Sequence, residues 1–407
     1  MFDVIKLIVV FGGIVIALRK NLFVGYTLFW ASLLVAILFN LSFYEILDNY
    51  KEVLRSHRFL NLLGIIFLIT FLGKISKEIG CLDKMVSATS NLRGGAKTAA
   101  TAMPLLVGMM PMPGGALLSA PLVDKVLPRD KYPAEFATAV NYWSRHVIEF
   151  FWPIYPGVIL AAGLTSLPIE IISFMNFPMT LFMLTISYFF FIKKIENKNN
   201  GHGLLIKPFL GILSAVWPIV LAIFLYAVLP INLLLSVTIS ILILLIIERP
   251  PLTKLKSVAK EVFSFRLFML VFGIISFQQM LEVTNAVNSI NLLSSQYGFP
   301  EAIIIILVAF SSGLLTGILV AMIGLSFTIL SGYLYQPDIN LSNIFLAFVA
   351  GYVGMIFSPT HFCLILTTEY FKANLGKVYR VFSLPLILLF MAGFLLFILG
   401  YPWDIFS

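Results

Sequence analysis

The feature that most limits how this chain can fold is its succession of long apolar stretches, separated by short loops that carry most of the charge. Most stretches approach the roughly 20 residues that an α-helix needs to cross a bilayer. Only 11% of the residues are charged, whereas soluble domains contain about 25%. The pattern predicts an all-α polytopic membrane protein. The candidate spans are 4–18, 21–40, 59–80, 134–163, 171–192, 208–229, 231–248, 266–286, 342–367 and 379–402.

Two further apolar stretches, 97–123 and 300–332, are rich in Gly, Pro, Ser or Thr. In the first, the segment GMMPMPGGALLSAP (108–121) gathers Pro111, Pro113, Gly114 and Gly115. A helix interior accommodates such a cluster only at a large cost in free energy. A bilayer tolerates open backbone only where protein or a water-filled cavity covers it. We therefore predict that both stretches are re-entrant helical hairpins, which enter and leave the membrane on the same side.

The distribution of basic residues supports that topology. With two re-entrant hairpins and Arg19 on the cytoplasmic side, the cytoplasmic loops hold nearly all of the 27 Lys and Arg residues. The exceptions are Lys6, Lys51, Arg55, Arg58 and Arg145. If 97–123 crossed the membrane once, every later loop would move to the other side, against the positive-inside rule. The net charge of +8 therefore reflects basic cytoplasmic loops and does not predict a nucleic-acid partner. We expect a multi-pass protein of the cytoplasmic cell membrane.

The order of spans also repeats after a shift of 206 residues. Under this shift FFWPIYPGVIL (150–160) matches IFSPTHFCLIL (356–366), with Pro153 opposite Pro359. We predict two repeats, 1–192 and 207–407, joined by a cytoplasmic linker, 193–206. Each holds five transmembrane helices and one hairpin, and an odd number of crossings makes the repeats inverted. Inverted repeats with interrupted helices are typical of secondary transporters, which bind substrate near the bilayer midplane.

The first interrupted span contains the ionisable residues of greatest interest. In NYWSRHVIEFFWPIYP (141–156), Asn141, Arg145 and Glu149 share one helix face, and His146 is adjacent. Arg145 would lie about 16 Å from the cytoplasmic end of the span, at a depth where an ionisable residue is costly and usually functional. Arg145 and Asn141 are candidates for binding an anion, and His146 and Glu149 for coupling to H⁺ or Na⁺. The alternative is that Arg145 and Glu149 only pair with each other.

The second interrupted span reads FSPTHFCLILTTEYF (357–371). Pro359 removes an N–H group and leaves nearby carbonyls without helical partners. These carbonyls and the hydroxyls of Ser358 and Thr360 are candidate ligands for substrate or ion. His361 is a candidate proton carrier, because its charge changes near neutral pH. A purely structural kink is the alternative.

The hairpin tips are the third source of candidate ligands. They are Pro113, Gly114 and Gly115 in the first half, and Gly324 and Ser326 in the second. Glycines at helix N-termini would let an anion approach backbone N–H groups. The alternative is helix packing through small residues. A further polar group, Gln278, Gln279 and Glu282, lies on the span 266–286 and faces either the site or a scaffold.

Other functions receive no support from motifs. Cys81 and Cys363 are far apart and show no metal or redox spacing, so we predict no metal and no cofactor. The chain contains no P-loop and no HExxH or GxSxG signature, so we predict neither ATP-driven transport nor an enzyme.

The paired hairpins and the breaks in NYWSRHVIEFFWPIYP and SPTHFCLILTTEYFKA resemble the ion transporter superfamily, which includes gluconate permeases and C4-dicarboxylate and citrate carriers. More closely, the whole chain resembles a family of archaeal and bacterial integral membrane proteins that is grouped with these carriers as a domain of unknown function. The resemblance implies a dimer-forming scaffold, a mobile transport domain that carries the hairpins, and Na⁺- or H⁺-coupled movement of organic anions.

One departure from the superfamily concerns the hairpin tips. Sodium-coupled dicarboxylate carriers bear Ser-Asn-Thr motifs there, whereas this chain has PMPGG and IGLSFT. The ligands of that branch therefore do not transfer, and the histidines favour H⁺ over Na⁺. We expect a secondary transporter of a small organic anion such as a carboxylate, working as a homodimer in the bilayer. An ion channel or an intramembrane enzyme using Ser358 and His361 are the alternatives.

Overall fold

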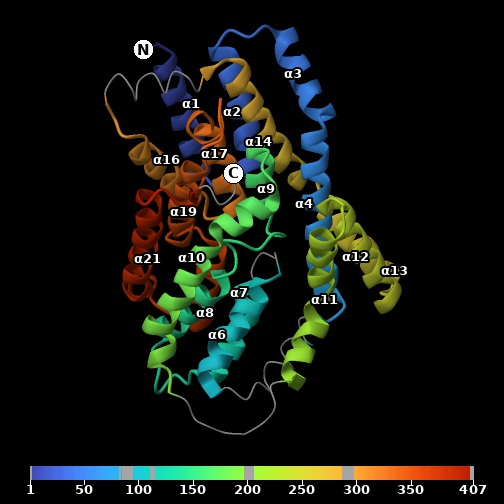
Figure 1. The fold of residues 1–407 in the computed structure, drawn as a ribbon, viewed down its shortest axis with the longest axis vertical. Coiled ribbons are helices and arrows are strands. Elements are labelled where there is room, and N and C mark those ends of the chain that lie inside the picture. Colours follow the sequence, from blue (N-terminus) through green and yellow to red (C-terminus); the bar gives the residue numbers. More distant parts are fainter. Residues whose placement is uncertain are drawn as a thin grey trace.

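The computed structural model describes residues 2–81, 84, 95–110, 115–196, 206–286 and 298–403. Within these ranges the regular secondary structure is helical, without any β-strand. Figure 1 shows an elongated bundle whose helices run mainly along or obliquely to its long axis. Four helices are long and apolar enough to cross a bilayer: α4 (His57–Glu78), α10 (Ile169–Phe190), α11 (Ile206–Val228) and α21 (Leu375–Ile398). The chain is therefore a helical membrane protein, as predicted.

The remaining helices follow the predicted order of spans closely. In the first half they are α1 (Phe2–Arg19), α2 (Val24–Leu38), α3 (Phe43–Arg55), α6 (Gly95–Gly108), α7 (Gly115–Val126), α8 (Ala134–His146), α9 (Pro156–Thr165) and the short 3₁₀ turn η1 (Ile192–Lys194). In the second half they are α12 (Leu233–Glu248), α13 (Leu252–Val262), α14 (Phe265–Val283), α16 (Glu301–Thr316), α17 (Leu319–Ile329), α18 (Ser331–Leu334), α19 (Leu341–Ile356) and α20 (Phe362–Phe371).

Two of these helices, α3 and α13, are additional to the predicted spans. They have 13 and 11 residues, which is too short for a crossing, and each buries only two side chains: Ile46 and Val53 in α3, Val258 and Val262 in α13. The start of α3 is fixed by a capping box, in which Ser42 and Glu45 bond each other's backbone N–H groups. Their polar faces explain why hydropathy alone misses them.

Each half contains one span that is interrupted. Helices α8 and α9 are separated by residues 147–155, and α19 and α20 by residues 357–361. Pro156 occupies the first turn of α9, where a proline needs no N–H partner. Pro359 lies in the second interruption, where its ring and missing N–H end the helical ladder.

Each half also contains a pair of short helices that pack on each other, α6 with α7 and α16 with α17. In Figure 1 these pairs lie toward opposite ends of the molecule. Other contacts come in matched sets: α4 packs on α12 and α13, while α14 packs on α2 and α3; α7 packs on α20, while α17 packs on α9. Each contact maps onto its counterpart when the two halves are exchanged. The predicted linker 193–206 is described only at 193–196 and 206.

Candidate functional site

The two interruptions meet in the interior through a buried cluster of ionisable and aromatic side chains. Arg145 and His146 end α8, Glu149 lies in the following turn, and His361 immediately precedes α20. Their exposed fractions are 2%, 1%, 5% and 6%. Four ionisable side chains at this depth cannot be accommodated by hydration, so they must be stabilised by one another and by backbone groups.

Arg145 and Glu149 form a salt bridge, with 2.8 Å between Nη1 and Oε1. The hydroxyl of Tyr155 lies 2.7 Å from the same carboxylate oxygen and 2.9 Å from the carbonyl oxygen of Gly108, the last residue of α6. The carboxylate thus joins the end of α8, the start of α9 and the first hairpin. Arg145 and Glu149 therefore do pair with each other along the helix, which was the alternative stated from the sequence, and the pair is buried.

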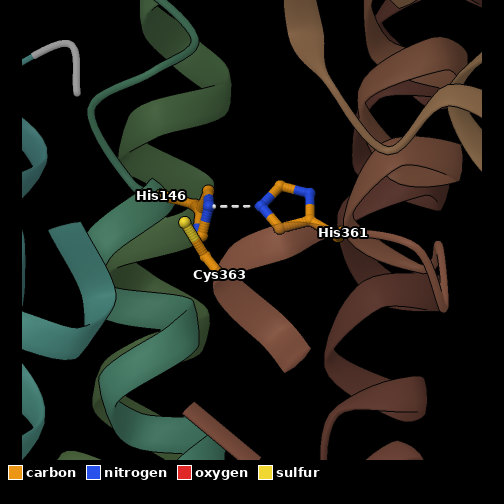
Figure 2. A group of neighbouring side chains, drawn as sticks. All are labelled: His146, His361 and Cys363. Carbon is orange, nitrogen blue, oxygen red and sulfur yellow. Dashed lines mark hydrogen bonds between the residues drawn. The ribbon is translucent and has the colours of Figure 1, made fainter. Parts of the chain in front are cut away.

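His146 and His361 face each other across the two halves, with 3.0 Å between their Nε2 atoms (Figure 2). The Nδ1 atom of His146 lies 2.6 Å from the carbonyl oxygen of Tyr142 and therefore carries a proton. In a neutral His146 the Nε2 lone pair then accepts the Nε2–H of His361. Figure 2 also shows Cys363, near the start of α20, with its sulfur directed toward His146.

Asn141 lies one turn before Arg145 and its amide is well satisfied. It donates to the Ala116 carbonyl at 2.9 Å and accepts from the Ser119 hydroxyl at 2.6 Å. Its amide nitrogen also lies 3.4 Å from the hydroxyl of Thr367. These bonds tie α8 to α7 and α20, so the predicted substrate ligand also positions the hairpin.

The first hairpin meets Arg145 at both ends of its turn. A Cβ atom on Gly108 would lie 2.2 Å from the Arg145 carbonyl oxygen, and one on Gly115 would lie 3.0 Å from both Nε and Nη2 of Arg145. The start of α7 is therefore in contact with the guanidinium. Two other predicted ligands in this turn, Pro113 and Gly114, lie outside the described residues.

The second hairpin turns at Gly317, and not near Gly324 and Ser326 as the sequence suggested. Gly317 adopts φ of +60°, which favours glycine, and a Cβ there would lie 2.9 Å from the amide nitrogen of His361. Gly324 lies within α17 against Ile274, and the Ser326 hydroxyl donates to the Met322 carbonyl. Four spread glycines, at 313, 317, 324 and 332, made the turn ambiguous from sequence.

The hydroxyls of the second interruption are bonded locally. Ser358 donates to the Leu314 carbonyl at 2.6 Å, its Oγ lies 2.8 Å from that of Thr360, and it accepts from the Thr360 N–H at 3.2 Å. Ser358 is buried, whereas Thr360 is exposed. These bonds hold the second interruption against α16, the first helix of the second hairpin.

The positive ends of four helices gather around this cluster. α7 begins against Arg145, and α20 begins directly after His361. α17 follows Gly317, which contacts the His361 backbone, and α9 begins beside α17, since a Cβ on Gly157 would lie 2.4 Å from Leu319 Cγ. Each N-terminus carries a partial positive charge and unsatisfied N–H groups. Helices α6 and α8 end at the same cluster, so Arg145 and the four N-termini are the groups there that favour an anion.

A second polar cluster lies near the end of α9. Arg58 donates to the carbonyl oxygens of Gly163 and Leu164, both at 2.7 Å, and to Gln278 at 3.0 Å. Glu282 accepts from Gln278 and Gln336, both at 2.8 Å. The predicted Gln278 and Glu282 therefore belong to a contact among α4, α9, α14 and the segment after α18, whereas Gln279 bonds Asn49 of α3 at 3.1 Å.

A family model for a protein of unknown function, DUF401, matches residues 4–399. The chain belongs to the DUF401 family. No curated protein shows a match to the chain. The match covers nearly the whole length of the chain, and both interruptions lie within it.

Sequence reasoning missed Tyr155 and Cys363 as members of the central cluster. Tyr155 stands between Pro153 and Pro156 in the first interruption, a position that marked it as close to the site. Nothing in the sequence marked Cys363 as a site residue, because His146, one of its two partners, lies 217 residues away along the chain. The aromatic residues Tyr142 and Tyr352 also belong here, because they donate to the carbonyls of Ile356 and His146.

Proposed function

We propose that this protein is a secondary active transporter of a small organic anion such as a carboxylate, coupled to H⁺ or Na⁺. One observation carries the proposal: Arg145 and the N-termini of α7, α9, α17 and α20 surround one buried cluster where both interruptions meet. Broken helices that direct their positive ends toward an anionic group are typical of transporter sites.

The architecture supports alternating access. Matched contacts between the two halves, with hairpin pairs toward opposite ends in Figure 1, favour two inverted repeats. The resemblance to the ion transporter superfamily points the same way. The cluster is buried, so substrate reaches it only when the helices around it part, first toward one side and then toward the other. A homodimer in the cytoplasmic membrane, with hairpins that move relative to a scaffold, completes the proposal.

The salt bridge suggests how anion and coupling ion would be linked. A substrate carboxylate would replace Glu149 as the partner of Arg145, because a guanidinium bonds planar carboxylates well. Glu149 would then be a buried anion without its cation, which is costly. A proton or Na⁺ at Glu149, with His146 and His361 beside it, would restore neutrality. Substrate and coupling ion would thus bind together.

The test first identifies a ligand and then replaces the Arg145 guanidinium, which can donate two parallel hydrogen bonds to a carboxylate. A thermal-shift screen of organic anions across pH and Na⁺ concentration identifies ligands, since binding to the folded state raises its stability. Uptake of the best ligand is then measured in proteoliposomes. Arg145→Lys keeps the charge but loses the bidentate geometry, and we expect uptake to fall by about tenfold or more, the effect of roughly 1.4 kcal/mol. Arg58→Lys is the matched control and should retain uptake.

Unchanged uptake of every tested anion by folded Arg145→Lys protein would remove Arg145 from the site. Counterflow separates a carrier from a channel: a carrier accumulates labelled anion driven by an opposing gradient of unlabelled anion, whereas a channel does not. The enzyme alternative is weakened by Ser358, whose hydroxyl donates to the Leu314 carbonyl and not to His361.

A further inference from the structure

We propose that His146, His361 and Cys363 form a binding site for a borderline or soft transition-metal ion of the Zn²⁺ type. Their ligand atoms all lie within 4.8 Å of one another, and all three side chains are buried. Imidazole and thiolate are the ligands that such ions prefer. The site goes beyond the proposed transport function and does not depend on it.

The surroundings of His146 are those of a metal ligand. Its Nδ1–H donates to the Tyr142 carbonyl, and this bond fixes the tautomer and aims the Nε2 lone pair at His361 and Cys363 (Figure 2). The His146 carbonyl in turn accepts from the Tyr352 hydroxyl, which holds the backbone at the end of α8. The ring orientation is therefore set before any ion binds.

His361 is held less firmly. Its Nδ1 atom is buried and has no hydrogen-bond partner among the described residues. Its Nε2 atom bonds Nε2 of His146. An ion between the two Nε2 atoms would replace that bond with two metal–nitrogen bonds, and the proton on His361 Nε2 would move to its Nδ1 atom, because a metal-bound nitrogen carries no proton.

The distances require only small movements. Two nitrogens bound at about 2.1 Å in a tetrahedral site lie roughly 3.4 Å apart, and a sulfur at about 2.3 Å lies somewhat farther from each. The Nε2 atoms stand 3.0 Å apart, so the rings must separate by a few tenths of an ångström while the Cys363 sulfur approaches. Rotation about side-chain bonds provides both changes.

The local charges also suit a cation. On binding, the Cys363 thiol loses a proton to solvent and becomes a thiolate ligand. The Glu149 carboxylate, whose Oε1 lies 3.9 Å from His146 Nε2, is the nearest fourth ligand. Thiolate and carboxylate supply two negative charges against the single positive charge of Arg145. The ion would bridge α8 of the first half and the start of α20 in the second, and so tie the two interruptions together.

Co²⁺ is the probe, because a cobalt–thiolate bond has an intense charge-transfer absorption in the near ultraviolet. Metal-stripped full-length protein in detergent is titrated with Co²⁺ alone, without any transport assay. We expect saturable absorption at about one ion per chain, with tetrahedral d–d bands, and its loss when Zn²⁺ is added. Cys81→Ser is the matched control, since Cys81 is the other buried free cysteine, and it should retain the full signal.

Cys363→Ser should abolish the charge-transfer band, and His361→Gln should weaken Co²⁺ binding by about tenfold or more and change the d–d bands. His361→Gln keeps the test decisive if Cys363→Ser does not fold. The site is refuted if the wild type shows no thiolate band, if Cys81→Ser loses it, or if it survives in Cys363→Ser. Failure of anion uptake would leave these spectra unchanged, so the two proposals fail separately.

Discussion

Arg58 and Arg145 are two inward-directed arginines whose side chains meet opposite ends of neighbouring helices. Arg58 donates to two carbonyls in the last turn of α9, where the helix carries partial negative charge. Arg145 instead contacts the start of α7 and lies beside a cluster at which three more helices begin. The fold itself satisfies the first arginine electrostatically. Arg145 lies in the last turn of α8, which favours its charge, but its guanidinium faces the start of α7 and is paired with Glu149.

This difference distinguishes a structural arginine from a candidate binding residue better than the depth of the residue in the membrane alone does. A cation at a helix C-terminus stabilises the fold and needs no ligand. A cation among helix N-termini stabilises the fold only when an anion accompanies it. In this protein the resident anion is Glu149, and the proposed substrate would take its place.

The largest expected effect comes from removing the Arg145 charge. Arg145→Met leaves the buried Glu149 carboxylate without its cation, and breaking a buried pair in this way costs about 3–5 kcal/mol. The double variant Arg145→Met/Glu149→Gln removes both charges and should recover most of that loss. The free energy of unfolding is measured by denaturant titration in detergent. A cost below about 1 kcal/mol for the single variant would mean that the pair is not buried.

The second expected effect concerns Arg58. Arg58→Met removes the bonds to the two α9 carbonyls, and hydrogen bonds from a charged group contribute about 1.5–3 kcal/mol when buried. Since Arg58 is only partly buried, we expect a loss of about 2 kcal/mol in stability. Uptake per folded molecule should be unchanged. Loss of uptake without loss of stability would make Arg58 part of the transport site and overturn the comparison.

The sequence predicted a helical membrane protein because hydropathy and proline positions are local or periodic signals. It placed the interruptions at Pro153 and Pro359 for the same reason. Helix α3 was missed because its polar face hides a short amphipathic helix. The second turn was misplaced, because glycine supports both turns and close helix packing, and only the backbone dihedral of Gly317 distinguishes them.

The candidate site could be predicted only in part. Arg145, Glu149 and His146 lie within one segment, so helical spacing brought them together. The contact of His146 with His361 joins different halves of the chain, and nothing in one sequence sets such a distance. Cys363 was discounted for the same reason, since metal-ligand spacing along the chain says nothing about ligands assembled by packing.

The smallest expected effect tests whether the second hairpin holds a helix N-terminus against the cluster. Gly317→Ala places a Cβ at φ of +60° and 2.9 Å from the His361 amide nitrogen. A left-handed conformation costs a non-glycine residue about 1–2 kcal/mol, and we expect a loss of that size in the free energy of unfolding.

Gly12→Ala in α1 is the matched control, because nothing lies within 4 Å of its Cβ position. Alanine there should be neutral or stabilise the helix by up to about 1 kcal/mol. If the two substitutions behave alike, the turn at Gly317 is not held against His361, and α17 would no longer count among the helix ends that set Arg145 apart from Arg58.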